Sequence, residues 1–106
     1  MARPFTHPAP QDMTLDGVLY ALSDPIRRAI VLKLLGCEGM SCSKAACTQI
    51  SPSTISFHYK ILRESGLVYS EKKGVEVINS VRDEDIDTRF PGLLASILNH
   101  HKTLNK

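Results

Sequence analysis

The chain of 106 residues has the length of one small domain. Apolar residues make up 42% of it, which argues against intrinsic disorder, and no apolar run approaches the ~20 residues of a membrane-spanning helix. The first residues lack the apolar core of a secretory signal, and three cysteines without such a signal argue against a disulfide framework. We therefore expect a cytoplasmic protein with no membrane partner.

The formal net charge is only +2, but the charge is unevenly distributed. Residues 25–74 carry +5, whereas residues 1–24 carry −2 and residues 75–106 carry −1. A basic centre between weakly acidic ends is typical of a surface that faces nucleic-acid phosphates. An ordinary solvated surface is the alternative interpretation.

Residues 1–13 contain three of the six prolines and predict a loose or extended, flexible N-terminal arm. Apolar side chains at helical spacing then predict a first helix from Thr14 to Leu22. We expect a single folded domain over residues 14–101, followed by a C-terminal tail over residues 102–106.

Clear end signals bound the second helix. Asp24 is a good N-cap, Pro25 suits the first helical position, and Gly36 suits the C-terminal end. An apolar stripe between them leaves the basic residues of this helix free to point outward. These residues are Arg27, Arg28 and Lys33.

A short helix and a longer capped helix follow. Residues 40–49 are weakly apolar and predict the short helix. Ser51 as N-cap and Pro52 at the first position begin the longer one, which ends at Gly66. Its buried face is expected to consist of Ile55, Tyr59 and Leu62. This order of elements is the layout of a helix-turn-helix.

Two β-prone runs, LVYS and VEVINSV, come next and are separated by EKKG, in which Gly74 supplies the positive φ of a hairpin turn. A two-stranded hairpin directly after a helix-turn-helix is a wing. The acidic run over residues 83–85 suits the first turn of a short helix, and Pro91 is expected to begin a last helix. The predicted fold class is mainly α with a two-stranded β-wing.

These segments resemble a known family. LSDPIRRAIVLKLL and SPSTISFHYKILRESGLV, at this spacing, look like the ArsR (ArsR/SmtB) family of bacterial winged-helix repressors. The tail SVRDEDIDTRFPGLLASIL resembles a branch of that family without an obvious metal site. The resemblance covers about residues 15–98. It implies a winged helix-turn-helix that forms a homodimer through its first and last helices.

The resemblance also implies that the helix over residues 52–65 enters the major groove of double-stranded DNA. An α-helix fits that groove, and its N-terminal residues meet base edges while its N–H groups face phosphates. The candidate DNA-binding residues are Ser53, Thr54, Ser56, Phe57, His58, Lys60, Lys72 and Lys73.

Each candidate has an alternative. Ser53 and Thr54 are also suited to capping the helix, and Phe57 to packing in the core. His58 is suited to a hydrogen bond with backbone or phosphate instead of a sequence-reading contact. Lys72 and Lys73 also fit an ordinary solvated turn, and the Val and Glu after Gly74 argue against deep insertion of the wing.

Two apolar strips, one on the first helix and one on the last, indicate a subunit interface, because one small core does not obviously need both. The alternative is that both strips pack within one subunit. The candidate dimerisation residues are Leu15, Val18, Leu19, Leu22, Leu93, Leu94, Ile97 and Leu98. A two-fold dimer predicts a pseudo-palindromic operator with half-sites about one helical turn apart.

Many members of the family release DNA on binding arsenic or a transition metal, but a matching site is not predicted here. Cys42 and Cys47 are five residues apart, which on one helix turns their side chains by about 140°. His100 and His101 are adjacent and are expected to be frayed terminal residues. We predict no metal site and no cofactor.

Redox or electrophile sensing is the remaining hypothesis for the cysteines. Cys42, near Lys44 at the start of a helix, is better placed to be a thiolate than Cys37, which follows a helix C-terminus. Oxidation or alkylation of Cys42, with Cys37, would then weaken DNA binding. The alternative is that these are small, semi-buried residues with no signalling role.

No motif of a known catalytic class occurs, so we do not expect an enzyme. We expect a DNA-binding transcriptional regulator, a repressor by resemblance, that binds a pseudo-palindromic operator and is released by thiol oxidation or another ligand. The inducer is not predicted. Two alternatives stay open: a metal-responsive repressor of the ArsR type, and a winged-helix protein-interaction module without DNA binding.

Overall fold

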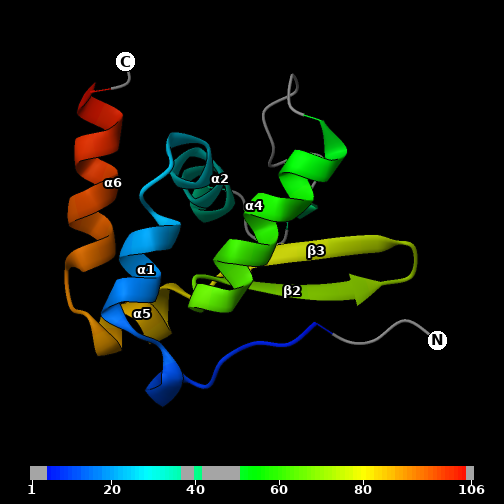
Figure 1. The fold of residues 1–106 in the computed structure, drawn as a ribbon, viewed down its shortest axis with the longest axis horizontal. Helices are drawn as coiled ribbons and strands as arrows, with labels where there is room; N and C mark the ends of the chain where they lie inside the picture. Colours follow the sequence, from blue (N-terminus) through cyan, green and yellow to red (C-terminus); the bar gives the residue numbers. More distant parts are fainter. Residues whose placement is uncertain (1–4, 37–39, 42–50, 105–106) are drawn as a thin grey trace.

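The computed structural model describes residues 5–36, 40–41 and 51–104 (Figure 1). In chain order its elements are the 3-10 helix η1 (Pro10–Asp12), helices α1 (Leu15–Ala21) and α2 (Pro25–Gly36), strand β1 (Met40–Ser41), helix α4 (Pro52–Ser65), strands β2 (Val68–Lys73) and β3 (Glu76–Val81), and helices α5 (Asp83–Arg89) and α6 (Leu93–Leu104). Helix α2 contacts both α4 and α6, and α4 packs against α1 and β2. None of the helices in the described residues has the length and hydropathy needed to traverse a lipid bilayer.

The predicted caps of α2 and α4 are confirmed. Asp24 Oδ1 accepts hydrogen bonds from the backbone N–H groups of Ile26 at 2.8 Å and Arg27 at 3.3 Å. Ser51 Oγ accepts from the N–H of Thr54 at 3.3 Å. These side chains satisfy N–H groups that the first turn of a helix leaves without intrahelical partners.

The C-terminal end of α4 depends on Gly66, which has a φ of 91°. This left-handed conformation favours glycine, and a Cβ at this position would lie 2.7 Å from side-chain atoms of Met13. The close approach joins the end of α4 to the N-terminal segment.

The predicted wing is confirmed. Strands β2 and β3 pair antiparallel from Val68↔Val81 to Lys73↔Glu76, and Gly74 has a φ of 64° in the turn. The sheet contains a third, two-residue strand, because β1 pairs with β3 in the order β1-β3-β2. Met40 and Ser41 were expected to begin a short helix, and that expectation is wrong for these two residues. The rest of that predicted helix lies outside the described residues.

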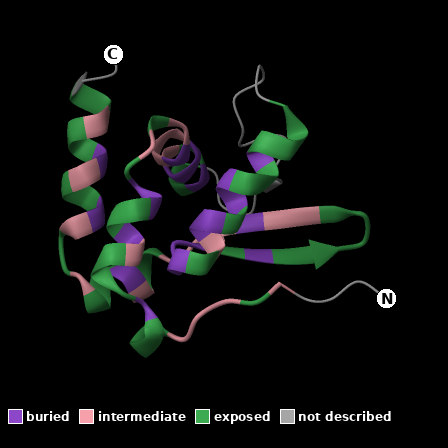
Figure 2. Ribbon diagram, viewed as in Figure 1, coloured by how far each residue is buried: buried purple, intermediate pink, exposed green. Residues whose placement is uncertain are grey.

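The core lies between α1, α2, α4, α5, α6 and the base of the hairpin (Figure 2). Val18, Ile30, Leu62, Leu67 and Ile86 are fully buried in it. The predicted inward face of α4 is confirmed, since all three of its members are buried. They are Ile55, Tyr59 and Leu62.

The last helix differs from the prediction at both ends. It begins at Leu93 instead of Pro91, because Gly92 has a φ of 78°, which is incompatible with an α-helix. It continues to Leu104, so residues 102–104 extend α6 instead of forming a tail.

The N-terminal segment is extended, as its prolines predict, and it runs alongside the hairpin (Figure 1). The ring of His7 stacks on Tyr69 at 4.4 Å between centroids, and its Nε2 accepts from the backbone N–H of Ser70 at 2.9 Å. Arg82 Nη1 donates to the carbonyl of Pro8 at 2.8 Å. The guanidinium of Arg63 lies 4.5 Å above the ring of Phe5. Residues 5–8 therefore lie at the edge of β2 that β3 leaves open.

Candidate nucleic-acid interface

The N-terminal half of α4 is largely exposed to solvent (Figure 2). Five of the predicted DNA-binding residues on this helix are exposed, namely Ser53, Thr54, Ser56, Phe57 and Lys60. Phe57 is 55% exposed, so the alternative that its ring is packed in the core does not hold. The exposed ring is available for contact with another molecule.

Thr54 and Ser53 also take part in the cap of α4. The hydroxyl oxygens of Ser51 and Thr54 are 2.8 Å apart, and those of Ser51 and Ser53 are 3.4 Å apart. The capping alternative therefore describes part of what these two side chains do. Ser56 and Phe57 lie farther along the helix than this cap.

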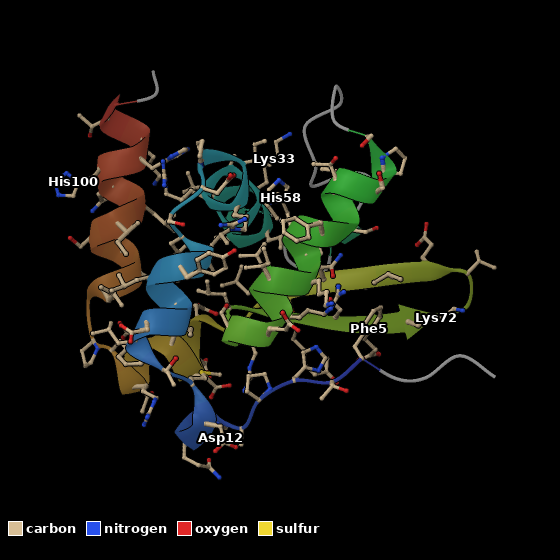
Figure 3. All side chains as sticks on the ribbon, in the orientation of Figure 1. Phe5, Asp12, Lys33, His58, Lys72 and His100 are labelled. Carbon is tan, nitrogen blue, oxygen red and sulfur yellow. The ribbon has the colours of Figure 1, made fainter. Side chains whose placement is uncertain are left out.

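The hairpin supplies two exposed lysines near its turn, where Figure 3 labels Lys72. The Nζ atom of Lys73 lies 3.7 Å from Glu71 Oε1, with both side chains at least half exposed. Such an exposed ion pair is worth little and is readily exchanged for another anion. The position and exposure of Lys72 and Lys73 leave them able to contact a phosphate.

His58 lies in the interior, on the side of α4 that faces α2 (Figure 3). It is 6% exposed, and its Nδ1 lies 3.2 Å from Nη1 of Arg27. A buried ring with this partner cannot also reach a base edge, so the structure speaks against the predicted direct contact of His58 with DNA. Its side chain instead joins two helices.

Arg27 was expected to point outward, and this expectation is wrong. Its side chain is 5% exposed, and its Nε and Nη2 donate to the carbonyls of Ala21 at 2.6 Å and Tyr20 at 3.1 Å. The last carbonyls of α1 have no donors within their own helix. The Arg27 guanidinium donates to both Tyr20 O and Ala21 O, and Tyr20 O also accepts from the hydroxyl of Ser23 at 2.6 Å. The sequence contains no local signal for this arrangement, because the partners come from α1 and α4.

The predicted dimerisation residues divide into two groups. Four of them belong to the core of one subunit, which agrees with the alternative of packing within the monomer: Val18, Leu22, Leu94 and Leu98. Leu15 and Leu19 on α1 are exposed, as is Tyr20, which is not among the predicted dimerisation residues. Leu93 and Ile97 on α6 are partly buried. The strip that can meet a second subunit is therefore narrower than predicted.

His101 is not a frayed terminal residue. It lies within α6, and its Nδ1 accepts from Nε of Arg28 at 3.0 Å. His100, its neighbour, is exposed. No group of three or more side chains suited to a metal ion occurs in residues 5–36, 40–41 and 51–104. Cys37 and Cys42, the candidate redox-sensing residues, lie outside the described residues.

Two comparisons bear on this surface. The sequence model of the family described as "Bacterial regulatory protein, arsR family" matches residues 24–70, which run from the cap of α2 into β2. The chain is also 34% identical to the uncharacterized HTH-type transcriptional regulator YceK of Bacillus subtilis (strain 168). That identity extends over 83 residues, which are 76% of this chain and 82% of the relative.

Proposed function

The chain belongs to the arsR family of bacterial regulatory proteins and is a DNA-binding transcriptional regulator; from that premise we propose that it is a repressor that binds a pseudo-palindromic operator as a homodimer. The family and the relative account for the regulator itself. The symmetry, the individual contacts and the sign of regulation form the proposal.

The observation that carries the proposal is the exposed N-terminal face of α4, together with the two exposed lysines near the turn of the hairpin. In our proposal α4 enters the major groove, where Ser53, Ser56 and Phe57 meet base edges and the Phe57 ring packs on a thymine methyl group. Lys60 contacts phosphate, as do Lys72 and Lys73 of the wing. Thr54 contributes mainly by keeping the first turn of α4 capped.

The second part of the proposal is a dimer formed by α1 and α6. It is supported by the exposed side chains of Leu15, Leu19 and Tyr20 and by the partly buried side chains of Leu93 and Ile97. Exposed apolar groups of this size on one small domain favour association with a second copy. In a two-fold dimer the two α4 helices would meet successive major grooves, about 34 Å apart.

The proposal is tested with a duplex of about 30 base pairs, enough for two half-sites one helical turn apart. The duplex is selected by the native protein from a random-sequence pool and compared with an unrelated duplex of equal length. We expect affinity for the selected duplex to exceed affinity for the unrelated one by at least ~10³-fold. Selection of no sequence, with equal affinity for all duplexes, would favour the protein-interaction alternative. In vitro transcription from a promoter that contains the selected sequence then distinguishes repression from activation.

A further inference from the structure

Two exposed aromatic side chains on different surfaces are joined by a buried pair between them. Tyr20, on α1, is 59% exposed, and its ring lies 5.3 Å from the Cζ atom of Arg27. Arg27 Nη1 lies 3.2 Å from His58 Nδ1. The His58 ring lies 5.9 Å from the ring of Phe57, at an interplanar angle of 57°. Tyr20, Arg27, His58 and Phe57 therefore form one continuous chain of contacts, which we call the Tyr20–Phe57 relay.

The two ends of the relay lie on the two surfaces of the proposed function. Tyr20 follows Leu19 on the exposed side of α1, where we propose the subunit interface. Phe57 lies on the exposed face of α4, where we propose the base contacts. The two middle residues are almost fully buried, so the contact between the surfaces runs through the interior of one subunit.

The geometry of the middle pair is strongly determined. A guanidinium in the interior must keep its donors occupied, because an unpaired buried charge is costly. Arg27 meets this need with Ala21 O, Tyr20 O and His58 Nδ1, which belong to α1 and α4. The planar fork of donors fixes these acceptors relative to one another, which lysine could not do. A shift of α1 that keeps these hydrogen bonds would therefore also move His58.

A second arginine holds the last helix to the same end of α1. Arg28 Nη1 donates to the carbonyl of Leu22 at 2.8 Å, and Arg28 Nε donates to His101 Nδ1 at 3.0 Å. Consecutive residues on a helix point about 100° apart, so Arg27 and Arg28 reach toward α4 and α6 respectively. Figure 1 shows α2 between those two helices. Arg28 thus connects α6 to the carbonyl end of α1, and Arg27 donates to carbonyls at the same end.

We propose that Arg27 and His58 are positioning residues that couple the state of the α1 surface at Tyr20 to the placement of Phe57 on DNA. This inference rests on the proposed function and adds to it a route by which subunit contact alters operator recognition. Neither residue touches DNA in this scheme. In this scheme the Arg27–His58 pair has two arrangements that differ in free energy. Contacts at the α1 surface and contacts of α4 with DNA each favour one arrangement over the other.

The first experiment compares affinity for the selected duplex with affinity for the unrelated duplex. We expect His58→Leu and Arg27→Met each to reduce that ratio about tenfold, which corresponds to the loss of one hydrogen bond to a charged group. The double variant should lose less than the product of the two single losses, because the residues act as a pair. His58→Gln retains an acceptor for Arg27 and should stay within about threefold of the native ratio. Lys33→Met, at an exposed position of α2, is the matched control and should leave the ratio unchanged.

A merely structural role is distinguished by melting temperature and by affinity for the unrelated duplex. Both should be similar for His58→Gln and the native protein, and the unrelated duplex should be bound by every folded variant. If His58→Leu does not fold, the comparison is made between His58→Gln and Arg27→Lys. Only Arg27→Lys should then lower the ratio of affinity for the selected duplex to affinity for the unrelated duplex. Equal ratios in the native protein and in a folded His58→Leu or Arg27→Lys variant would overturn the inference.

The second experiment tests coupling to the α1 surface. Tyr20→Ala changes an exposed side chain, so it should fold. At protein concentrations where the dimer is fully formed, we expect it to lower the ratio about threefold in the native background and not in the His58→Gln, Arg27→Lys background. Equal losses in both backgrounds would overturn the relay. If instead the native protein selects no sequence from the random pool, the proposed function fails, and that outcome is separate from failure of the relay alone.

Discussion

The Nε2 atom of His7 accepts a hydrogen bond from the backbone N–H of Ser70 at 2.9 Å, which fastens the N-terminal segment to the wing. Only an imidazole with an unprotonated Nε2 can accept this bond. Burial, and then the positive charges of Arg82 and Arg63, hold the pKa of the His7 imidazole below its ordinary value of 6.5. The attached state therefore favours the neutral ring.

This relationship predicts that the attachment of the segment weakens in acid. Because the pKa of His7 is lower in the attached state than in the free one, the free state binds more protons as the pH falls. The contribution of the bond is fully present above pH 6.5 and is lost as the pH falls from 6.5 through the lowered pKa. Amide exchange of Ser70 can be followed by NMR between about pH 7.5 and 5. After correction for intrinsic exchange rates, the protection of this amide should decrease as the pH falls. In His7→Gln, whose amide oxygen accepts at any pH in this range, protection should not vary.

A second prediction concerns the end of α4. Gly66→Ala places a methyl group 2.7 Å from Met13 in a left-handed conformation with a φ of 91°. Both the backbone and the contact oppose it, so we expect a loss of about 2–4 kcal/mol in the free energy of unfolding. Gly74→Ala is the matched control, since its φ is 64° but no atom lies within 4 Å of the added methyl group. It should lose only about 1 kcal/mol. Equal losses in urea unfolding would mean that the contact with Met13 does not matter.

The third prediction concerns phosphate contacts. Lys60→Ala and Lys72→Ala should each weaken binding to the selected and the unrelated duplex by similar factors, because phosphates carry no sequence information. The slope of log affinity against log salt should fall by about 1 for each lysine removed. Lys102→Ala, at an exposed position on α6, should leave the slope unchanged. An unaltered slope for both Lys60→Ala and Lys72→Ala would contradict the proposed docking of α4 and the wing.

Features of the fold that depend on residues close together in the sequence were predictable, and features that depend on residues far apart in the sequence were not. The ends of α2 and α4 are set by residues within three positions of each cap, such as Asp24 and Ser51, and these were predictable. The hairpin turn at Gly74 is equally local. The pairing of Arg27 with His58 joins positions 31 residues apart, and no local pattern distinguishes an inward arginine from an outward one.

The same reasoning explains why the exposed face of α4 was predicted correctly and the buried residues of α1 and α6 were not. Helical periodicity identified the exposed face of α4 with Ser56 and Phe57, because that face is opposite the apolar stripe. Periodicity could not tell which apolar residues of α1 and α6 are used within one subunit. Val18 and Leu19 are both apolar and adjacent in sequence, yet Val18 is fully buried and Leu19 is exposed. The attachment of the N-terminal segment was also beyond prediction, since it depends on the open edge of β2.

That division between Val18 and Leu19 gives the last prediction. Leu19→Glu changes an exposed side chain, so the free energy of unfolding of one subunit should change by less than about 0.5 kcal/mol. If α1 forms the proposed interface, the charge must be buried in the dimer without a partner, and the dimer dissociation constant should rise at least ~100-fold. Sedimentation equilibrium measures this constant directly. Val75→Glu, at the nearly fully exposed tip of the wing, is the matched control and should leave the dimer intact.

Val18→Ala should instead affect the stability of each subunit. It removes buried methyl groups and should lower the free energy of unfolding by about 1–3 kcal/mol. A native protein that stays monomeric at micromolar concentration, or a Leu19→Glu variant that dimerises as well as the native chain, would show that α1 is not the subunit interface.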